Sequence, residues 1–322
     1  MTSERKGLPG LNQRASGVVK DLKARASLYR VEPLEIPGGG IVIDAGVQAA
    51  GGLAAGIAVA RACVADLAEI SILPAASEFP GSPTVQIWTD YPVTACMASQ
   101  YAGWQISVGS FKAMGSGPMR TAHDGEELIR QLGCREHPEV LVGVLETSVL
   151  PGAEVLSYIA GKTGIAAENI NLIVARTRSV AGGVQVVART VETALHKLHF
   201  LGFDLSRVEH GLGQAPLPPP AKGDLGALGR TNDAVLYGGR VTLWVRGDDD
   251  SLRELGPNVP SSSSRDYGAP FRQIFERYGF DFYKVDPGLF SPAQLTFHNI
   301  ETGKTHRFGA VDRNVLEKSF FG

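Results

Sequence analysis

The segment from Ser179 to Phe200 reads SVAGGVQVVARTVETALHKLHF and predicts one amphipathic helix around which the fold is organised. Its apolar residues recur at the spacing of a helix face that packs on a core: Val184, Val187, Val191, Ala194, Leu195 and Leu198. A polar stripe is offset from this face by one residue, roughly 100° around the helix, and contains Gln185, Arg189, Glu192, His196 and His199. We expect this stripe to lie at the margin of the buried face, where a helix can line a cleft.

Two charged residues of the polar stripe, Arg189 and Glu192, are three positions apart, so their side chains are expected to touch. A charged pair that is half-buried at a cleft wall is a candidate for catalysis, and a solvated helix edge is the alternative. Glu192, His196 and His199 also have a spacing that permits metal ligation from one helix face. We favour histidines at a cleft edge and expect no metal site, because the chain has no H-E-x-x-H sequence and its other histidines are scattered.

The composition is that of a globular protein with a substantial core. The chain has 322 residues, of which 43% are hydrophobic and 20% charged, a length that suggests two domains or one large one. The net charge is −2 and no basic stripe is present, so no nucleic-acid partner is expected. The N-terminus has no apolar signal segment, and the longest apolar stretch, residues 41–68, is interrupted by polar residues. We therefore expect no membrane partner and a cytoplasmic location. The three cysteines, Cys63, Cys96 and Cys134, are far apart in the chain, so we expect them to be buried free thiols.

Strand and helix patterns alternate through most of the chain and predict the α/β class, with mixed sheets. The continuous apolar run at Val140–Leu145 is typical of a buried strand, and Ile170–Val174 is predicted as another strand. Gly51–Leu67 predicts a helix of small residues that packs very closely. Four prolines fall within residues 211–226 and predict a surface connection there. The simplest division is an N-terminal α/β domain at 1–210, which carries the long helix, and a C-terminal α/β domain at 227–322. A discontinuous first domain is the alternative.

The sequence GSFKAMGSGPMR, Gly109–Arg120, predicts a glycine-rich loop. Its exposed backbone N–H groups and flanking cations would suit an anion site, for which the candidates are Lys112, Ser116, Gly117 and Arg120. A plain turn is the alternative. The loop does not match the phosphate-binding G-x-x-x-x-G-K-[ST] pattern, the chain lacks a dinucleotide fingerprint, and no G-x-S-x-G is present. NAD, FAD and an α/β-hydrolase serine are therefore not expected.

Three further polar residues are candidates for substrate binding. Asn232 and Asp233 belong to a polar segment, Gly229–Asp233, which we interpret either as a loop that recognises a heterocycle or as a turn before a strand. Asp44 ends the predicted strand GIVIDAG, and ligands of open α/β sheets bind at the carboxyl ends of strands.

Four of these motifs together resemble the methenyltetrahydromethanopterin cyclohydrolase family, in the same order and over most of the chain: Ile41–Gly56, Gly115–Arg120, Ser179–Lys197 and Gly229–Val241. The resemblance implies two α/β domains that enclose an inter-domain substrate pocket, and a homotrimer. It also implies reversible hydrolysis of 5,10-methenyltetrahydromethanopterin, or its dephospho form, to the 5-formyl compound in the one-carbon metabolism of methanogens and of methylotrophs that degrade formaldehyde. The tetrahydromethanopterin-type carrier is then the substrate, and no cofactor or metal is needed.

In that family the catalytic arginine and glutamate stand in an R-x-x-E sequence, which here is Arg189 and Glu192. We hypothesise that Glu192 accepts and donates the protons of the reaction, and that Arg189 orients Glu192 and tunes its pKa. Two other functions stay open: a methenyl or methylene dehydrogenase of the same pathway, and a non-catalytic pterin-binding protein. A folate substrate is a third alternative.

Overall fold

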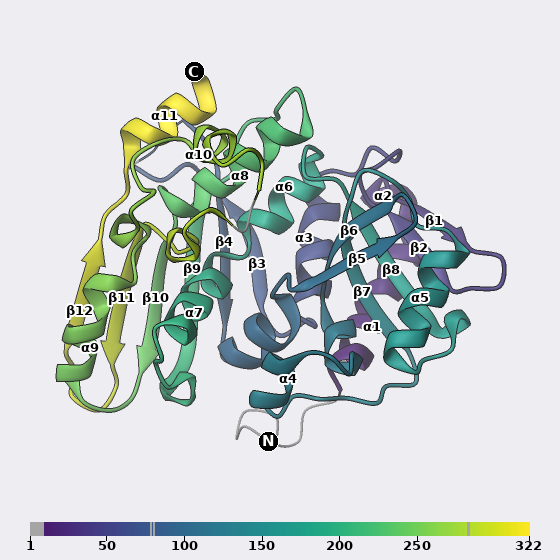
Figure 1. Cartoon of the computed structure of the whole chain (residues 1–322), viewed down its shortest axis with the longest axis horizontal. Coiled ribbons are helices and arrows are strands. Elements are labelled where there is room, and N and C mark those ends of the chain that lie inside the picture. Colours follow the sequence, from purple (N-terminus) through teal and green to yellow (C-terminus); the bar gives the residue numbers. More distant parts are fainter. Residues whose placement is uncertain (1–9, 78, 80, 282–283) are drawn as a thin grey trace. The chain divides into compact units, whose positions relative to one another are not determined.

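The computed structural model describes residues 10–77, 79, 81–281 and 284–322. Its contacts divide the chain into two compact units, and each unit is assembled from two separate segments. The first unit consists of Met1–Ala68 and Thr94–Gln185, and the second of Glu69–Val93 and Val186–Gly322. Each unit is built on one six-stranded mixed sheet, so the predicted α/β class is confirmed (Figure 1). The domain limits expected at 1–210 and 227–322 stay a prediction.

The sheet of the first unit has the strand order β1-β2-β8-β7-β6-β5. β2, β8 and β7 are parallel, and β1, β6 and β5 extend the sheet as antiparallel strands. The strands are β1 (Glu32–Glu35), β2 (Ile41–Asp44), β5 (Trp104–Val108), β6 (Phe111–Ser116), β7 (Leu141–Glu146) and β8 (Ile170–Ala175). The helices are α1 (Leu11–Ala24), α2 (Ala26–Tyr29), α3 (Leu53–Cys63), α4 (Glu127–Gln131), α5 (Ala153–Thr163) and most of α6 (Val180–Val187).

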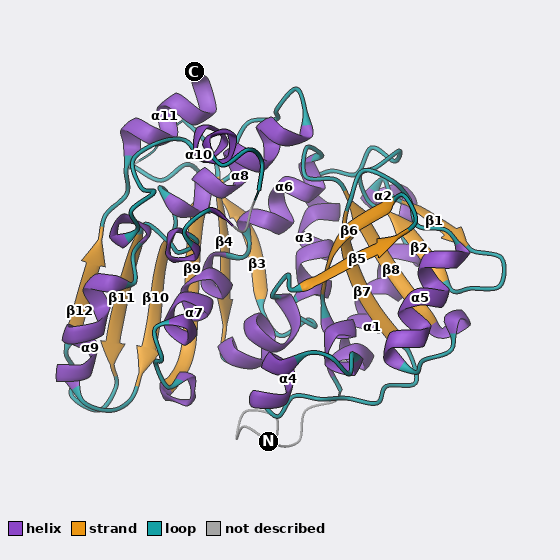
Figure 2. Cartoon of the chain, viewed as in Figure 1, coloured by secondary structure: helices purple, strands orange, loops and turns teal. Residues whose placement is uncertain are grey.

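Both faces of this sheet are buried, because successive side chains of each strand point to opposite sides. On one side Ile43 and Ile173 belong to a core formed with α1 and α3. On the other side Val42 and Leu172 belong to a core formed with α5 (Figure 2). This two-sided burial explains why β7 is apolar from Leu141 to Leu145 rather than alternating, and why β8 is apolar except at Asn171.

The small-residue helix expected at Gly51–Leu67 is α3, which is shorter than predicted. It packs against α1, and at Gly56 it closely approaches α6 of the same unit. A Cβ on Gly56 would lie 2.6 Å from Cβ of Val184 and 3.0 Å from Cα of Ala181. Only glycine therefore fits where the two helices cross.

The sheet of the second unit has the order β12-β11-β10-β9-β4-β3, in which β10 and β11 are parallel and the other pairs antiparallel. The strands are β3 (Glu69–Leu73), β4 (Thr84–Thr89), β9 (Val208–Pro216), β10 (Arg240–Val245), β11 (Gln294–Asn299) and β12 (Thr305–Gly309). The helices are α7 (Thr190–Phe200), α8 (Asp224–Leu236), α9 (Asp249–Leu255), α10 (Phe271–Arg277) and α11 (Arg313–Phe321).

This second sheet is buried on one face, as the alternation along β10 shows: Val241, Leu243 and Val245 are buried, whereas the residues between them are half-buried. Helices α7 and α8 lie on the buried face (Figure 1). Residues 211–216, expected as part of a surface connection, belong instead to the central strand β9. Across the part of the chain that the structure describes, no helix has both the length and the apolar character needed to cross a membrane.

Candidate active site

The helix predicted from Ser179 to Phe200 is interrupted, and the structure contains two helices, α6 and α7, in its place. Arg189 occupies the N-cap position of α7 with φ −83° and ψ 8°. Its N–H donates to the carbonyl of Val186, three residues back, rather than four. The hydroxyl of Thr190 donates to the carbonyl of Val187 at 2.7 Å, which competes with regular helix hydrogen bonding. The prediction of one continuous helix was therefore wrong at this point.

Close packing on β9 fixes the first turn of α7. Cβ atoms placed on Gly211 and Gly213 would each lie 2.9 Å from a methyl group of Val191. The strand thus uses glycine where the helix approaches its backbone. This contact holds the segment that carries the charged pair, because Val191 lies between Thr190 and Glu192 in the chain.

Arg189 and Glu192 form an ion pair, as their spacing predicted. Nη1 of Arg189 lies 3.8 Å from Oε2 of Glu192, and the side chains are 10% and 7% exposed. The separation is that of a charge–charge contact, longer than a hydrogen bond. Glu192 also lies in the first turn of α7, where the helix dipole stabilises a negative charge. A buried carboxylate held in this way is suited to accept and return a proton.

The histidines of the polar stripe lie further along α7. Burial lowers the pKa of His196, and the neighbouring His199 and Lys197 act in the same direction. His199 is exposed. Among the described residues, no group of three or more histidine, cysteine, aspartate or glutamate side chains is arranged to hold a metal ion.

Asp44 ends β2, and its carboxylate organises the loop that follows. Oδ1 accepts from the N–H groups of Gly46 and Val47 at 2.9 and 2.7 Å, and Oδ2 accepts from those of Gln48 and Ala49 at 2.8 Å each. The side chain is buried. Four backbone donors thus occupy the acceptor positions that we expected a ligand to use.

The segment Gly109–Arg120, expected as a glycine-rich loop, is mostly strand β6 followed by a short 3-10 helix at Pro118–Ala122. Ser116 is buried, with its hydroxyl 3.4 Å from the carbonyl of Val144. Gly117 has φ 87°, which favours glycine, and its N–H donates to the carbonyl of Ser99 at 2.9 Å. Lys112 is exposed on β6.

Arg120 is fully buried and paired within its own unit. Its Nε and Nη2 atoms donate to Glu126 at 3.0 and 2.7 Å, and Nη1 donates to the carbonyl of Tyr101 at 2.8 Å. The guanidinium also lies 4.8 Å from the centroid of the Tyr101 ring. These partners take much of the hydrogen-bonding capacity that an anion would use, and the role of Arg120 in binding stays a prediction.

Asn232 and Asp233 lie in helix α8, so the expected loop or turn at Gly229–Asp233 was wrong. Asn232 donates to the carbonyl of Leu228 at 2.9 Å. Asp233 is fully buried and accepts from the N–H of Phe271 at 2.7 Å and the hydroxyl of Ser319 at 2.6 Å. Burial raises the pKa of Asp233 to about 7, although these two hydrogen bonds act in the opposite direction. The side chain ties α10 and α11 to α8.

Glu146 is a polar residue that the sequence interpretation did not single out. It ends β7 and is half-buried. Its carboxylate accepts from the hydroxyl of Thr177 and from Nε2 of Gln185, the latter at 3.5 Å. The signal was present in the sequence, because Glu146 follows a buried apolar run as Asp44 does.

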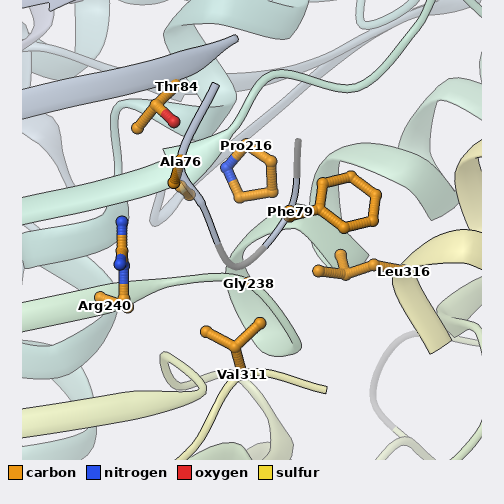
Figure 3. Close-up of a pocket in the computed structure, with 9 residues that line it drawn as sticks. Ala76, Phe79, Thr84, Pro216, Gly238, Arg240, Val311 and Leu316 are labelled. Atoms are coloured by element: carbon orange, nitrogen blue, oxygen red, sulfur yellow. The ribbon is translucent and has the colours of Figure 1, made fainter. Parts of the chain in front are cut away.

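The hollows differ greatly in size. A hollow of about 600 Å³ in the first unit is lined by residues of α2, β1 and the loops after β2 and β7, including Arg30, Asp44, Gln48 and Leu150. This volume is within the range of small-molecule sites. Another hollow, in the second unit, has a volume of about 10 Å³, with Arg240 on one side and Phe79 and Leu316 on the other (Figure 3). It has room for about one water molecule and excludes a pterin.

Comparison with known proteins identifies relatives over nearly the full chain. The model of a family described as Cyclohydrolase (MCH) matches residues 10–320. The chain is 47% identical over 317 residues to the methenyltetrahydromethanopterin cyclohydrolase of Rhodopirellula baltica, which covers 97% of this chain and 95% of that protein. It is 44% identical over 313 residues to the enzyme of that name from Methylobacillus flagellatus, with 97% and 95% covered. For the enzyme of that name from Methanococcoides burtonii the identity is 38% over 312 residues, with 96% and 98% covered.

Proposed function

The chain belongs to the methenyltetrahydromethanopterin cyclohydrolase family, and on this premise we propose that Arg189 and Glu192 carry out its reaction. The activity is that of a hydrolase of one-carbon metabolism, which acts on a C–N bond in a cyclic amidine. The observation that carries the assignment of residues is the buried ion pair of Arg189 and Glu192, with 3.8 Å between its charged atoms.

The substrate is a cation in which the methenyl carbon lies between N5 and N10 and shares the positive charge with them. The carbon is therefore already electrophilic. The reaction requires a positioned water molecule, a group that accepts a proton during attack, and a group that donates a proton when N10 leaves. One carboxylate can meet both proton requirements in turn.

Glu192 serves as that carboxylate. The oxygen of water attacks the methenyl carbon while Glu192 accepts one proton, and a neutral carbinolamine forms. Glu192 then returns the proton to N10 as the C–N10 bond breaks. The remaining hydroxyl proton leaves to solvent as the formyl C=O forms on N5, so that one water is consumed and one proton released. The negative charge of the ionised carboxylate also attracts the cationic substrate.

Arg189 orients the carboxylate and stabilises its ionised form. The guanidinium lies beside Glu192 at the N-terminal end of α7, where the helix dipole acts on the carboxylate in the same direction. Because the guanidinium lies 3.8 Å from the carboxylate, a change of protonation state at Glu192 breaks no hydrogen bond to Arg189.

The remaining expectations about binding stay proposals. Lys112 is exposed and suits an anionic group of the carrier's tail. The other candidates, whose side chains or backbone groups are engaged within their own units, are Asp44, Ser116, Gly117, Arg120, Asn232 and Asp233. The substrate pocket enclosed by two domains and the homotrimer likewise stay predictions, the latter to be checked by light scattering.

The direct test is loss of the absorbance of the methenyl group on incubation with the purified protein. We expect turnover with methenyltetrahydromethanopterin or its dephospho form, no requirement for NAD(P), and little turnover with methenyltetrahydrofolate. Turnover that appears only when NAD(P) is added would instead support a dehydrogenase. Binding of the pterin without any turnover would support a non-catalytic pterin-binding protein.

A further inference from the structure

The first unit presents two carboxylates at one edge of its sheet. β2 and β7 run parallel on either side of β8, with Asp44 beside Val174 and Glu146 beside Ala175 in the strand register. Asp44 and Glu146 therefore end their strands at the carboxyl edge of the sheet, where ligands of open α/β sheets bind.

The two carboxylates differ in the number of hydrogen-bond acceptor positions that the protein leaves open to a ligand. Each carboxylate has about four acceptor positions, two on each oxygen. Those of Asp44 receive four backbone N–H groups, two per oxygen. Those of Glu146 receive one donor per oxygen in the described part of the chain: the hydroxyl of Thr177 at Oε1 and the amide of Gln185 at Oε2. One acceptor position on each oxygen of Glu146 is therefore left for a ligand.

The supports of Glu146 also fix the direction of its carboxylate. Thr177 follows β8, and Gln185 projects from α6, so two different elements hold the two oxygens. The side chain is half-buried, which leaves it accessible while partly shielding it from water. Gln185 belongs to the polar stripe of the central segment and stands four residues before Arg189 in the chain.

We propose that Glu146 binds the 2-amino-pyrimidinone edge of the substrate's pterin, an assignment that rests on the proposed function. That edge presents two N–H donors side by side, the 2-amino group and N3–H. Two adjacent acceptors on a fixed carboxylate match them as they match a guanidinium, with two parallel charge-assisted hydrogen bonds. The recognition role that we expected for Asp44, from its place at the end of a strand, is assigned to Glu146. Asp44 instead orders the loop that follows β2.

The test compares two competitive inhibitors, 6,7-dimethyltetrahydropterin and its 2-desamino analogue, with wild type and with Glu146→Gln. Wild type is expected to bind the 2-amino compound at least about tenfold more tightly, because an analogue without the 2-amino group leaves an acceptor of Glu146 unpaired. Glu146→Gln keeps an oxygen for Thr177 but places an amide donor opposite the ligand's donors. We expect its preference to fall to about one, and its KM for the coenzyme to rise at least about tenfold.

The matched control is Glu168→Gln, an exposed glutamate of the same unit, which should keep the wild-type preference. If Glu146→Gln does not fold, Glu146→Asp retains the charge but withdraws it by one methylene, and its preference should be at least threefold weaker than in wild type. A preference that is equal in wild type and either folded variant overturns the proposal, as does a wild type that does not discriminate. Wild-type hydrolysis of the coenzyme in the same preparation separates this failure from failure of the proposed function.

Discussion

Each unit buries an arginine–glutamate pair, and the two pairs are built differently. In the first unit, Arg120 makes two hydrogen bonds to Glu126 at 3.0 and 2.7 Å and is 0% exposed. In the second unit, Arg189 approaches Glu192 through one contact of 3.8 Å. Arg120 also has the carbonyl and the ring of Tyr101 as partners.

We expect this difference to distinguish a structural pair from a catalytic one. A bidentate pair of short hydrogen bonds is strong and specific in geometry, so a proton transfer at Glu126 would cost both bonds. The 3.8 Å contact between Arg189 and Glu192 is longer than a hydrogen bond, so Glu192 can gain or lose a proton without breaking a hydrogen bond to Arg189. Similar residue types at similar burial therefore favour opposite roles, and the variants below test this reading.

The largest effect is expected for Glu192→Gln. The amide has nearly the same shape but cannot accept a proton from water, so kcat should fall by about 10²- to 10⁴-fold. The thermal midpoint should fall less than in Glu126→Gln, because the contact between Arg189 and Glu192 is longer than a hydrogen bond. The measurement is single-turnover loss of methenyl absorbance at saturating coenzyme. A kcat within tenfold of wild type would remove the basis for distinguishing the two pairs.

Glu126→Gln should act on stability instead. It leaves the fully buried guanidinium of Arg120 without a charged partner, at a cost of about 3 kcal/mol. Urea unfolding followed by circular dichroism measures this cost. The turnover per mole of folded enzyme should fall far less than in Glu192→Gln. If this variant loses turnover while keeping wild-type stability, the tight pair has a catalytic role.

Asp233→Asn should flatten the pH dependence of stability. The pKa of Asp233 is about 7 in the folded chain, against about 4 in an unfolded one, so the folded state binds the proton more tightly. Its contribution is full below about pH 4 and is lost as the pH rises towards 7. Between pH 4 and pH 6 the free energy of unfolding should fall by about 2 kcal/mol in wild type through this group. The asparagine variant should not show this fall. Parallel stability curves for the two proteins would contradict this.

The smallest effect is expected at an exposed ion pair, which serves as a reference for the two buried pairs. Glu127 and Arg130 form an ion pair with side chains 62% and 55% exposed. Glu127→Gln should change the free energy of unfolding by about 0.3 kcal/mol, measured in the same urea titration. A loss comparable with that of Glu126→Gln would show that burial is not what distinguishes the pairs.

The sequence predicts those parts of the fold in which local pattern and tertiary packing agree. β7 is recognisable as an apolar run because both of its faces are buried, and β8 is apolar except at Asn171. Glycines misled the prediction elsewhere. Gly229 suggested a loop, but it lies in α8, where a Cβ would come within 3.0 Å of Cβ of Arg272. Gly211 and Gly213 similarly serve the approach of α7 to β9, a contact that no local pattern reveals.

For the site, spacing along a helix sufficed to predict that Arg189 and Glu192 meet, and their contact confirms it. The roles of the two residues stay a prediction. The sequence could not show that the carboxylates of Asp44 and Asp233 accept hydrogen bonds from backbone N–H groups, because the positions of those groups depend on the folded backbone. The place of Glu146 at the end of an apolar run is visible in the sequence, but the donors that hold its carboxylate are known only from the structure.

The segmental make-up of the second unit has a consequence for biosynthesis. The hairpin of β3 and β4 is completed at Thr89, but its sheet neighbour β9 begins at Val208, 119 positions later. At about 5–20 residues per second, a ribosome needs roughly 6–24 s to bridge that interval. Through this time the hairpin is a two-stranded piece with an unpaired edge, which is marginally stable alone. The nascent chain is thus expected to expose this strand edge well before α7 has been translated.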